Sequence, residues 1–173
     1  MRKKINWVVT ALMLSLFLGA GSMQKAQADA ASDAALKAAR KGIQAGYSKR
    51  DATSAKLDYD GFWSTRTKNY VWISKDGRRK GIKQLREETR RLFNAAESIN
   101  GRAAIQKITL KGNTATVLIK DSGTVVIPAK NKKNVIKVTE RASDTWVKSG
   151  NKWLLSQSRS LASYVTVNGK QVK

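Results

Sequence analysis

Apolar residues recur at helical spacing in two separate segments of the chain. The first set lies three or four positions apart along one stripe: Leu36, Ala39, Ile43 and Tyr47. The second stripe repeats this spacing from Ile82 to Ile99 and is followed by Asn100-Gly101. Both of these residues tolerate the left-handed conformation that commonly ends a helix. We therefore predict one helix through the first stripe and a longer one from Ile82 to Ile99.

The region between these stripes predicts two smaller elements. Asp51 is the expected N-cap of a short second helix with Tyr59 and Phe62 on its apolar side. The run Tyr70–Ser74 is rich in aromatic and β-branched residues and is followed by a turn signal at Asp76-Gly77. This run predicts a short strand before the long helix.

From Ala103 onward the pattern changes to short runs typical of strands. The predicted strands are Ala103–Leu110, Thr114–Lys120, Thr124–Ile127, Val135–Val147, Lys152–Ser158 and Tyr164–Val167. The predicted turns are Gly112-Asn113, Asp121-Ser122-Gly123, Gly150-Asn151 and Asn168-Gly169. Helices followed by successive hairpins predict an α+β fold in which the helices pack on one face of a strongly curved antiparallel sheet.

One hairpin can be assigned a register from the sequence. If Lys148–Asn151 form the loop, Trp146 lies opposite Trp153 as an aromatic cross-strand pair. The same register places Glu140 opposite Arg159, and this polar pair would lie either on the surface or on the floor of a pocket.

The order of elements and the segment Asp144–Trp153 resemble the cone-shaped domains of the nuclear transport factor 2-like superfamily, which includes ketosteroid isomerase and polyketide cyclase relatives. The resemblance covers about Ala31 to Ser163. It implies a cystatin-like cone with a pocket between the helices and the concave sheet, and it allows a homodimer through the outer sheet face. In the isomerase-like members a carboxylate base stands on the strand before the Gly-containing loop, but Tyr70–Ser74 contains no acid.

Aromatic and polar residues supply the candidates for the wall of that pocket. They are Tyr47, Tyr59, Trp63, Tyr70, Trp72, Trp146 and Gln157. The alternative for each aromatic residue is an ordinary place in the core, where large aromatic side chains are common.

The chain contains no His and no Cys, which limits the chemistry that it can perform. Histidine proton shuttles, thiolate nucleophiles and disulfides are excluded. The acids do not have the spacing of a calcium loop, so we predict no metal site and no cofactor, and the catalytic residues stay unknown.

The charge of the chain is strongly positive, with 34 Lys and Arg against 12 Asp and Glu. The densest group on and before the long helix is a candidate contact for an anionic surface or polymer: Arg78, Arg79, Lys80, Lys83, Arg86 and Arg90. The alternative is a basic surface that only maintains solubility. No motif of a sequence-specific nucleic-acid reader is present in the sequence.

The first 28 residues have the pattern of a cleavable signal peptide. Basic residues at the start precede an apolar run from Ile5 to Ala20, and Ala26-Gln27-Ala28 supplies the small residues of a cleavage site. We therefore predict export to the periplasm or the extracellular space after cleavage near Ala28 or Ala30. Residues 29–173 would then form a single domain.

These observations favour an exported, noncatalytic module that binds a small apolar or amphipathic ligand. The first alternative is an isomerase, cyclase or dehydratase-like enzyme that uses Tyr and Asp groups in the pocket. The second alternative is an envelope-associated interaction protein without a pocket. A pocket with a buried carboxylate would favour the enzyme, whereas an aromatic pocket without one would favour the binding module.

Overall fold

The computed structural model describes residues 32–172 of the chain. The predicted signal peptide, residues 1–28, lies outside the described residues. The chain divides into a segment that ends at Ala38 and a compact unit that begins at Ala39, and the fold described below is that of this second unit.

Three helices lie before or between the strands of the unit. The first is helix 32–55, whose residues Ala39, Ile43 and Tyr47 are buried as its stripe predicts. Helix α2 (Tyr59–Trp63) is capped by Asp58, whose carboxylate accepts a hydrogen bond from the Gly61 amide at 2.9 Å. Helix α3 (Ile82–Ala95) follows a β-hairpin.

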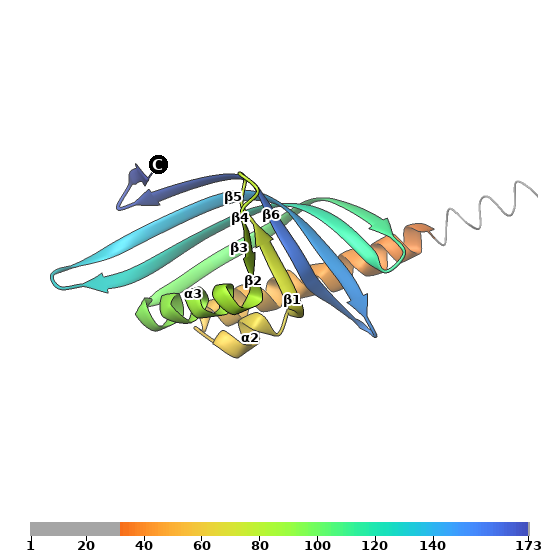
Figure 1. The fold of residues 1–173 in the computed structure, drawn as a ribbon, viewed down its shortest axis with the longest axis horizontal. Helices are drawn as coiled ribbons and strands as arrows, with labels where there is room; N and C mark the ends of the chain where they lie inside the picture. The colour runs from red at the N-terminus through yellow and green to blue at the C-terminus, as the bar shows by residue number, and fades with distance from the viewer. Residues whose placement is uncertain (1–31, 173) are drawn as a thin grey trace, which may run out of the picture. The chain divides into compact units, whose positions relative to one another are not determined.

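The strands form one seven-stranded sheet (Figure 1). They are β1 (Arg66–Ile73), β2 (Arg79–Gly81), β3 (Ser98–Lys111), β4 (Thr114–Ala129), β5 (Lys132–Ser149), β6 (Lys152–Val167) and β7 (Lys170–Val172). Their order is β2-β1-β6-β5-β4-β3, with β7 paired to β6. All neighbours pair antiparallel except β1 and β6, which pair parallel.

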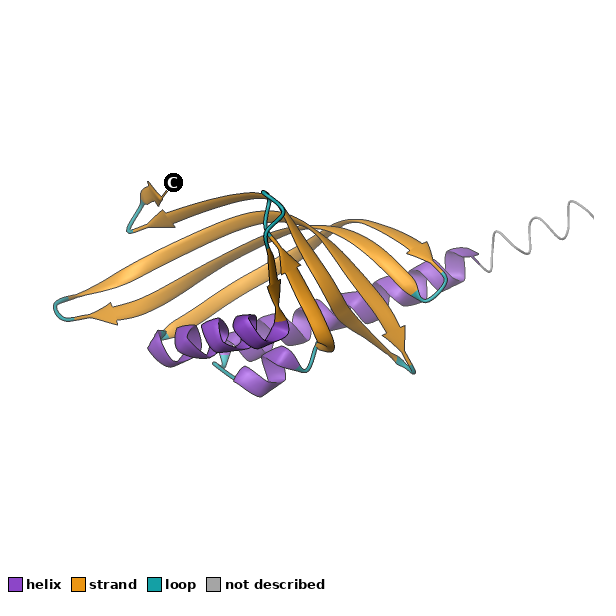
Figure 2. Ribbon diagram, in the orientation of Figure 1, coloured by secondary structure: helices purple, strands orange, loops and turns teal. Residues whose placement is uncertain are grey.

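The helices lie along one face of the bent sheet (Figure 2). The core fills the space between them, and its largest fully buried apolar side chains are Trp146, Tyr47, Ile43, Ile119 and Val117. This arrangement confirms the predicted α+β fold with helices on a curved, largely antiparallel sheet.

Two of the predicted helix boundaries are wrong. The first helix continues through Asp51 to residue 55, so Asp51 lies inside this helix and does not cap the second one. Helix α3 ends at Ala95, and Asn100-Gly101 belong to β3, where they pair with Thr124 and Gly123 of β4. Sheet pairing here overrides the local preference for a helix end.

Two pairs of predicted strands are single long strands. The predicted turn at Asp121–Gly123 lies inside β4, because Ser122 pairs with Arg102 on one side and Thr139 on the other. Strand β6 continues from Lys152 to Val167, and its register with β5 shifts at two bulges. The turns at Gly112, Gly150 and Gly169 occur where they are predicted.

The register predicted for the β5–β6 hairpin is wrong. Gly150-Asn151 alone form the loop, and Gly150 has a φ of 57°, so Lys148 faces Trp153 and Trp146 faces Leu155. With the two bulges added, Glu140 faces Ser163 and Arg159 faces Ser143. Glu140 and Arg159 therefore form no cross-strand pair, and alternation places them on opposite faces of the sheet.

Candidate functional site

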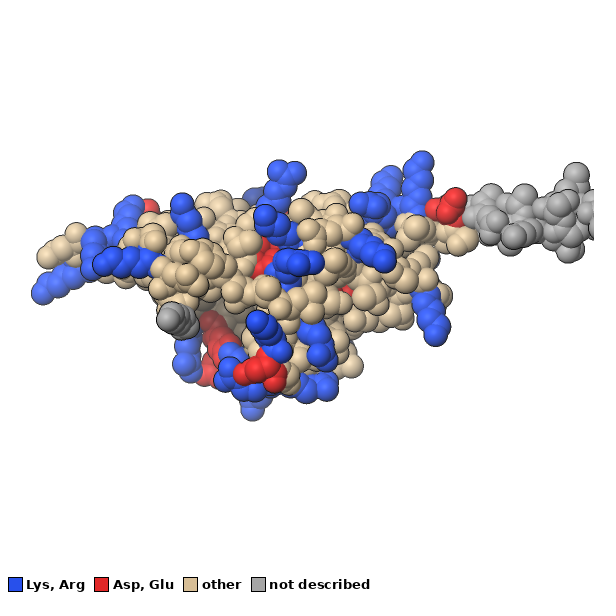
Figure 3. All heavy atoms as spheres, turned by 90° about the horizontal axis from the view of Figure 1, so that it is seen from above, with Lys and Arg blue, Asp and Glu red and all other residues tan. Residues whose placement is uncertain are grey.

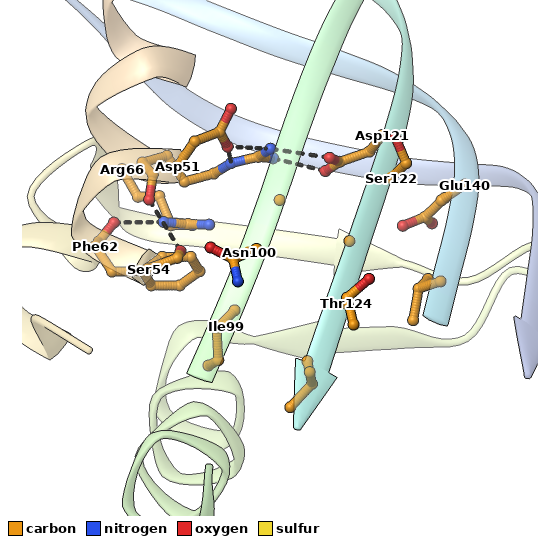
Figure 4. A pocket seen from close by; sticks show the side chains of 15 residues that line it. Asp51, Ser54, Phe62, Arg66, Ile99, Asn100, Asp121, Ser122, Thr124 and Glu140 are labelled. Atoms are coloured by element: carbon orange, nitrogen blue, oxygen red, sulfur yellow. Dashed lines mark hydrogen bonds and ion pairs between the residues drawn. The ribbon is translucent and has the colours of Figure 1, made fainter. Parts of the chain in front are cut away.

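Two adjoining chambers open between the helices and the concave face of the sheet. The large chamber has a volume of about 290 Å³ and the small chamber about 100 Å³. Four charged residues line both chambers: Arg50, Arg66, Asp121 and Glu140. Figure 4 shows several of the residues that line the large chamber.

The charged residues of the cavity continue apolar stripes of the core. On helix 32–55, Arg50 and Ser54 follow Tyr47 at spacings of three and four, so they face the same way as the buried stripe. On β4, Asp121 follows Val117 and Ile119 at alternate positions. On β5, Glu140 and Asp144 alternate with Ala142 and Trp146 in the same way. Alternation in the strands therefore turns all three of these acids toward the interior.

Arg50 is held by two carboxylates at the edge of the cavity. Its guanidinium pairs with Asp51 at 2.7 Å and with Asp121 at 2.8 Å, and Asp51 also accepts a hydrogen bond from the Ala103 amide at 3.2 Å. Burial alone would lower the pKa of Arg50, but Asp121 and Asp51 outweigh it and raise this pKa. Arg50 is thus a satisfied structural cation.

A buried hydrogen-bonded network lies beside the small chamber. The Tyr47 hydroxyl donates to Asp144 Oδ2 at 2.6 Å and accepts from Trp146 Nε1 at 3.0 Å. The two rings meet edge to face, with centroids 4.8 Å apart. All three side chains are almost completely buried. Burial and the neighbouring Asp144 raise the pKa of Tyr47, so its hydroxyl keeps its proton.

Asp144 keeps one oxygen free of this network. Its Oδ1 is buried and has no hydrogen-bond partner among the described residues. Burial raises the pKa of Asp144, although the hydrogen bond from Tyr47 and the nearby Ser158 oppose this rise. Asp144 lines the small chamber and is therefore the carboxyl best placed to exchange a proton with a bound molecule.

Glu140 is a second carboxyl with a raised pKa in the same cavity. Burial raises its pKa, and the hydroxyl of Ser160 opposes that rise, while the negative charges of Asp121 and Asp144 add to it. Its side chain lies beside Asp121 and Thr124 at the wall of the large chamber (Figure 4). Glu140 is half-buried, so it remains within reach of solvent.

Arg66 is the cation of the cavity that no carboxylate neutralises among the described residues. Its Nη1 donates to the Phe62 carbonyl at 2.5 Å and to Thr65 Oγ1 at 3.3 Å, whereas its buried Nε has no partner. The guanidinium lies over the rings of Phe62, Trp63 and Tyr70, with its carbon 3.9, 4.9 and 5.3 Å from their centroids. Burial lowers the pKa of Arg66 to about 10, so it is still charged at neutral pH.

Part of the wall of the large chamber is apolar. Phe62, Ile99, Val125 and Val138 supply its hydrocarbon surface. Gly101 and Gly123 face each other across β3 and β4, and a side chain added at Gly101 would meet only the Ser122 carbonyl at 3.6 Å. The absence of side chains at these two glycines leaves room for the chamber.

This arrangement can hold an amphipathic molecule and exchange protons with it. A guanidinium with a free Nε suits an anionic head, the apolar wall suits a hydrocarbon body, and two carboxyls of raised pKa lie nearby. The described residues contain no group of three side chains able to hold a metal ion. They also contain no helix that is both long and apolar enough to cross a membrane.

The predicted pocket residues divide into lining and supporting positions. Tyr70 and Trp72 line the small chamber. Tyr47, Trp63 and Trp146 are core residues, as the alternative interpretation expects.

Two further pocket candidates lie elsewhere. Tyr59 lies against α3, where its hydroxyl donates to the Arg86 carbonyl and its ring meets Phe93 edge to face. Gln157 pairs with Thr145 and Val71 in the sheet, and alternation turns it away from the cavity.

The basic residues before and on α3 lie outside the cavity and are partly neutralised. Lys80 pairs with Glu88 at 2.9 Å, Arg78 with Asp76 at 2.8 Å and Arg86 with Asp60 at 3.8 Å. The guanidinium of Arg90 lies over the Tyr59 ring. Arg79 and Lys83 are exposed.

The sequence interpretation missed most of the charged residues that form the cavity. Arg50, Asp51, Arg66, Asp121 and Asp144 belong to it, and only Glu140 was predicted, with a different partner. The sequence signal that could have identified them is a charged residue at a position that the periodicity assigns to the apolar face of a helix or strand.

Comparison with known proteins gives a likeness of structure only. No protein-family model matches the sequence, and no curated protein matches it. Among solved structures, a conserved protein from Planctomyces limnophilus superposes with a TM-score of 0.64 at 15% identity over 76% of this chain and 98% of its own.

Two candidate dehydratases have similar structures. A scytalone dehydratase candidate from Novosphingobium aromaticivorans gives a TM-score of 0.62 at 9% identity over 76% of this chain and 89% of its own. A dehydratase candidate of the nuclear transport factor 2-like family from Streptomyces avermitilis gives 0.56 at 9% identity over 69% of this chain and 93% of its own. The predicted resemblance is confirmed at the level of structure: the chain has the fold of the nuclear transport factor 2-like superfamily.

Proposed function

We propose that this protein is an exported module that binds a small amphipathic organic anion in the two chambers. The head of the ligand, a carboxylate, lies against Arg66, and its hydrocarbon body lies along the apolar wall of the large chamber. The proposal concerns a small molecule, because the large chamber lies at the lower end of the volumes typical of ligand pockets.

The observation that carries this proposal is that Arg66 is a cation in the cavity without a paired carboxylate among the described residues. A guanidinium in a cavity requires compensation for the water that it has lost. Arg50 receives this compensation from two paired acids. Arg66, in contrast, has a carbonyl, the hydroxyls of Thr65 and Tyr70 and aromatic faces, and it forms no ion pair within residues 32–172. A carboxylate ligand would supply the missing partner and form charge-assisted hydrogen bonds with it.

The proposal of export rests on the N-terminal pattern of the sequence. A charged start, an apolar run and a small-residue cleavage pattern are typical of a signal peptide. N-terminal sequencing of the protein recovered from outside the cytoplasm should begin at Asp29 or Ala31. A protein that retains Met1 would contradict cleavage.

An acid–base enzyme is the second candidate, and Asp144 is the specific observation that favours it. A buried carboxyl lies in the cavity with one oxygen free and a raised pKa. This is the feature that distinguishes an enzyme from a simple binding module, and two structurally similar proteins are candidate dehydratases. The presence of a cavity argues against the remaining alternative, an interaction protein without a pocket.

Binding can be tested with 4-phenylbutyrate, and its neutral amide serves as the control ligand. Trp72 lines the small chamber, so its fluorescence should change when the probe binds. We expect Arg66→Met to weaken carboxylate binding by about 10–100-fold, the equivalent of one charge-assisted hydrogen bond. The control variant Arg79→Met removes an exposed arginine outside the cavity and should bind normally.

A second variant keeps this test meaningful if Arg66→Met does not fold. Gly101 lines the large chamber and a Cβ there would meet only the Ser122 carbonyl, so Gly101→Leu should fill the chamber and block the probe. Equal binding of the carboxylate and the amide by the wild-type protein would contradict the proposal.

A separate measurement distinguishes the two candidates. Benzoylacetate, a 3-oxo acid, carries acidic protons whose exchange in D2O is visible by proton NMR. A binding module should leave the exchange rate unchanged. Faster exchange that Asp144→Asn abolishes while binding persists would establish the enzyme instead.

A further inference from the structure

We propose that the outer face of the sheet, opposite the cavity, binds a flexible linear phosphodiester polymer. The binding residues form a diagonal line across four strands and are called the cation row: Arg102 on β3, Lys120 on β4, Arg141 on β5 and Arg159 on β6. This surface differs from the basic group on α3, and the proposal does not depend on the cavity.

Strand register places these four cations in one line. Lys120 lies directly opposite Arg141. Arg102 lies opposite Ser122, one diagonal step from Lys120, and Arg159 lies opposite Ser143, one diagonal step from Arg141. Directly opposite side chains are about 5 Å apart and diagonal neighbours about 7–8 Å, so the row is about 20 Å long.

The outer face of these four strands carries no acid to balance the row. Strands β3 to β6 contain three acids, Asp121, Glu140 and Asp144, and all three face the cavity. Figure 3 views the molecule from the sheet side and shows Lys and Arg side chains spread over this face with few carboxylates between them.

The four cations are exposed and unpaired. Within the described residues none of them forms a side-chain hydrogen bond or an ion pair, in contrast to Lys80, Arg78 and Arg86 near α3. Lys120 and Arg141 are like charges in a direct cross-strand position, which destabilises a sheet. An anionic partner would convert this repulsion into attraction.

The side chains between the cations favour a thin polymer over other partners. Within strands β3 to β6, the other residues directly opposite the four cations are small, which lets a polymer lie close to the sheet. They are Ala104, Ser122, Ser143 and Ala162. A second copy bound through this face would bring two cation rows together and be repelled. A membrane-binding face normally inserts a cluster of large apolar or aromatic residues, whereas these positions opposite the cations carry small side chains.

The test uses a fluorescein-labelled abasic deoxyribose-phosphate 12-mer, which presents phosphodiesters without bases. Its anisotropy with the full chain, measured against salt, should give a slope of about −3 in a plot of log affinity against log salt, as four contacts predict for a single strand. The triple variant Arg102→Gln, Lys120→Gln, Arg141→Gln should reduce this slope by about 2. The matched control Lys75→Gln, Lys83→Gln, Lys130→Gln removes the same charge from exposed positions elsewhere and should keep the slope.

Three results would overturn the proposal. Equal weakening by the triple variant and its control would mean that net charge alone attracts the polymer. Tighter, row-dependent binding to vesicles with 30% phosphatidylglycerol than to the 12-mer would identify a membrane surface instead. If the triple variant does not fold, Arg102→Gln alone should still reduce the slope by about 0.7, and an unchanged slope would refute the row.

Discussion

A single hydroxyl links the core to the cavity. Tyr47 donates to Asp144 and accepts from Trp146, so one buried oxygen satisfies two other buried polar groups. A buried polar group without a partner is costly, so these two hydrogen bonds stabilise the folded chain. The network therefore holds the Asp144 carboxyl in place while leaving its other oxygen directed elsewhere.

Tyr47→Phe should destabilise the protein strongly. The change leaves Asp144 Oδ2 and Trp146 Nε1 buried without the hydrogen-bond partner that Tyr47 provides, at a cost of about 1–3 kcal/mol for each group. Urea unfolding measures this cost. The control is Tyr164→Phe, because Tyr164 is 52% exposed, and a loss below about 0.5 kcal/mol is expected there. Similar losses in the two variants would refute the network.

Asp144→Asn should change how stability depends on pH. Burial raises the folded-state pKa of Asp144, so its contribution is fully present below the pKa of the unfolded chain and is lost as pH rises through the folded value. Asparagine does not titrate but can still accept the Tyr47 hydrogen bond. The variant should therefore gain stability relative to the wild type as pH rises above the ordinary pKa of an aspartate, about 4.

Urea unfolding of both proteins across this pH range provides the measurement. The charge of Asp144 contributes to the raised pKa of Glu140, so both proteins are compared in a Glu140→Gln background. A difference that stays constant with pH, or that falls as pH rises, would contradict the raised pKa of Asp144.

At the scale of elements, two glycines set the distance between helix 32–55 and the sheet. A Cβ at Gly46 would lie 2.7 Å from the Trp146 ring, and one at Gly42 would lie 2.6 Å from the Trp153 ring. The helix can approach the tryptophan side chains this closely only because both positions lack a side chain. This close packing positions Tyr47 and Arg50 at the cavity.

Gly46→Ala should destabilise the protein despite the better helix propensity of alanine. Trp146 is 1% exposed and cannot move away, so overpacking should cost about 1–3 kcal/mol. Gly42→Ala is the comparison, because Trp153 is only partly buried and can shift. Thermal unfolding should therefore give a clearly lower melting temperature for Gly46→Ala. Equal melting temperatures would contradict a rigid contact.

Element types were more predictable than their ends and pairings. The stripes from Leu36 and from Ile82 depend only on local periodicity, so both helices were predicted correctly in type. The β5–β6 register depends on two bulges that no local pattern marks, which is why Glu140 was paired with the wrong residue. Asn100-Gly101 joined β3 because a neighbouring strand was available to pair with them.

At the scale of the whole unit, the helices and the bent sheet enclose a cavity whose position follows from the fold but whose chemistry does not. The resemblance to known cone-shaped domains predicted a pocket, and the pattern of elements supported it. The charged lining escaped prediction because Arg66 and Asp121 come from distant segments that only the tertiary structure joins. One-sequence reasoning cannot place such residues together.

The net positive charge also has a distribution that composition could not predict. The acids of the long strands face the cavity, whereas the cation row faces outward. The two faces of one sheet thus carry different chemistry, which agrees with one proposed ligand inside and another outside.

The most direct test of the central claim is the NMR signal of the Arg66 Nε–H group in the 15N-labelled protein, assigned by its loss in Arg66→Lys. This hydrogen has no partner in the structure. Our account predicts that 4-phenylbutyrate shifts the signal downfield in a saturable way, because a carboxylate becomes its acceptor, while the amide does not. An Arg66 signal that stays unchanged while the probe binds would show that the ligand is held elsewhere and would contradict the account.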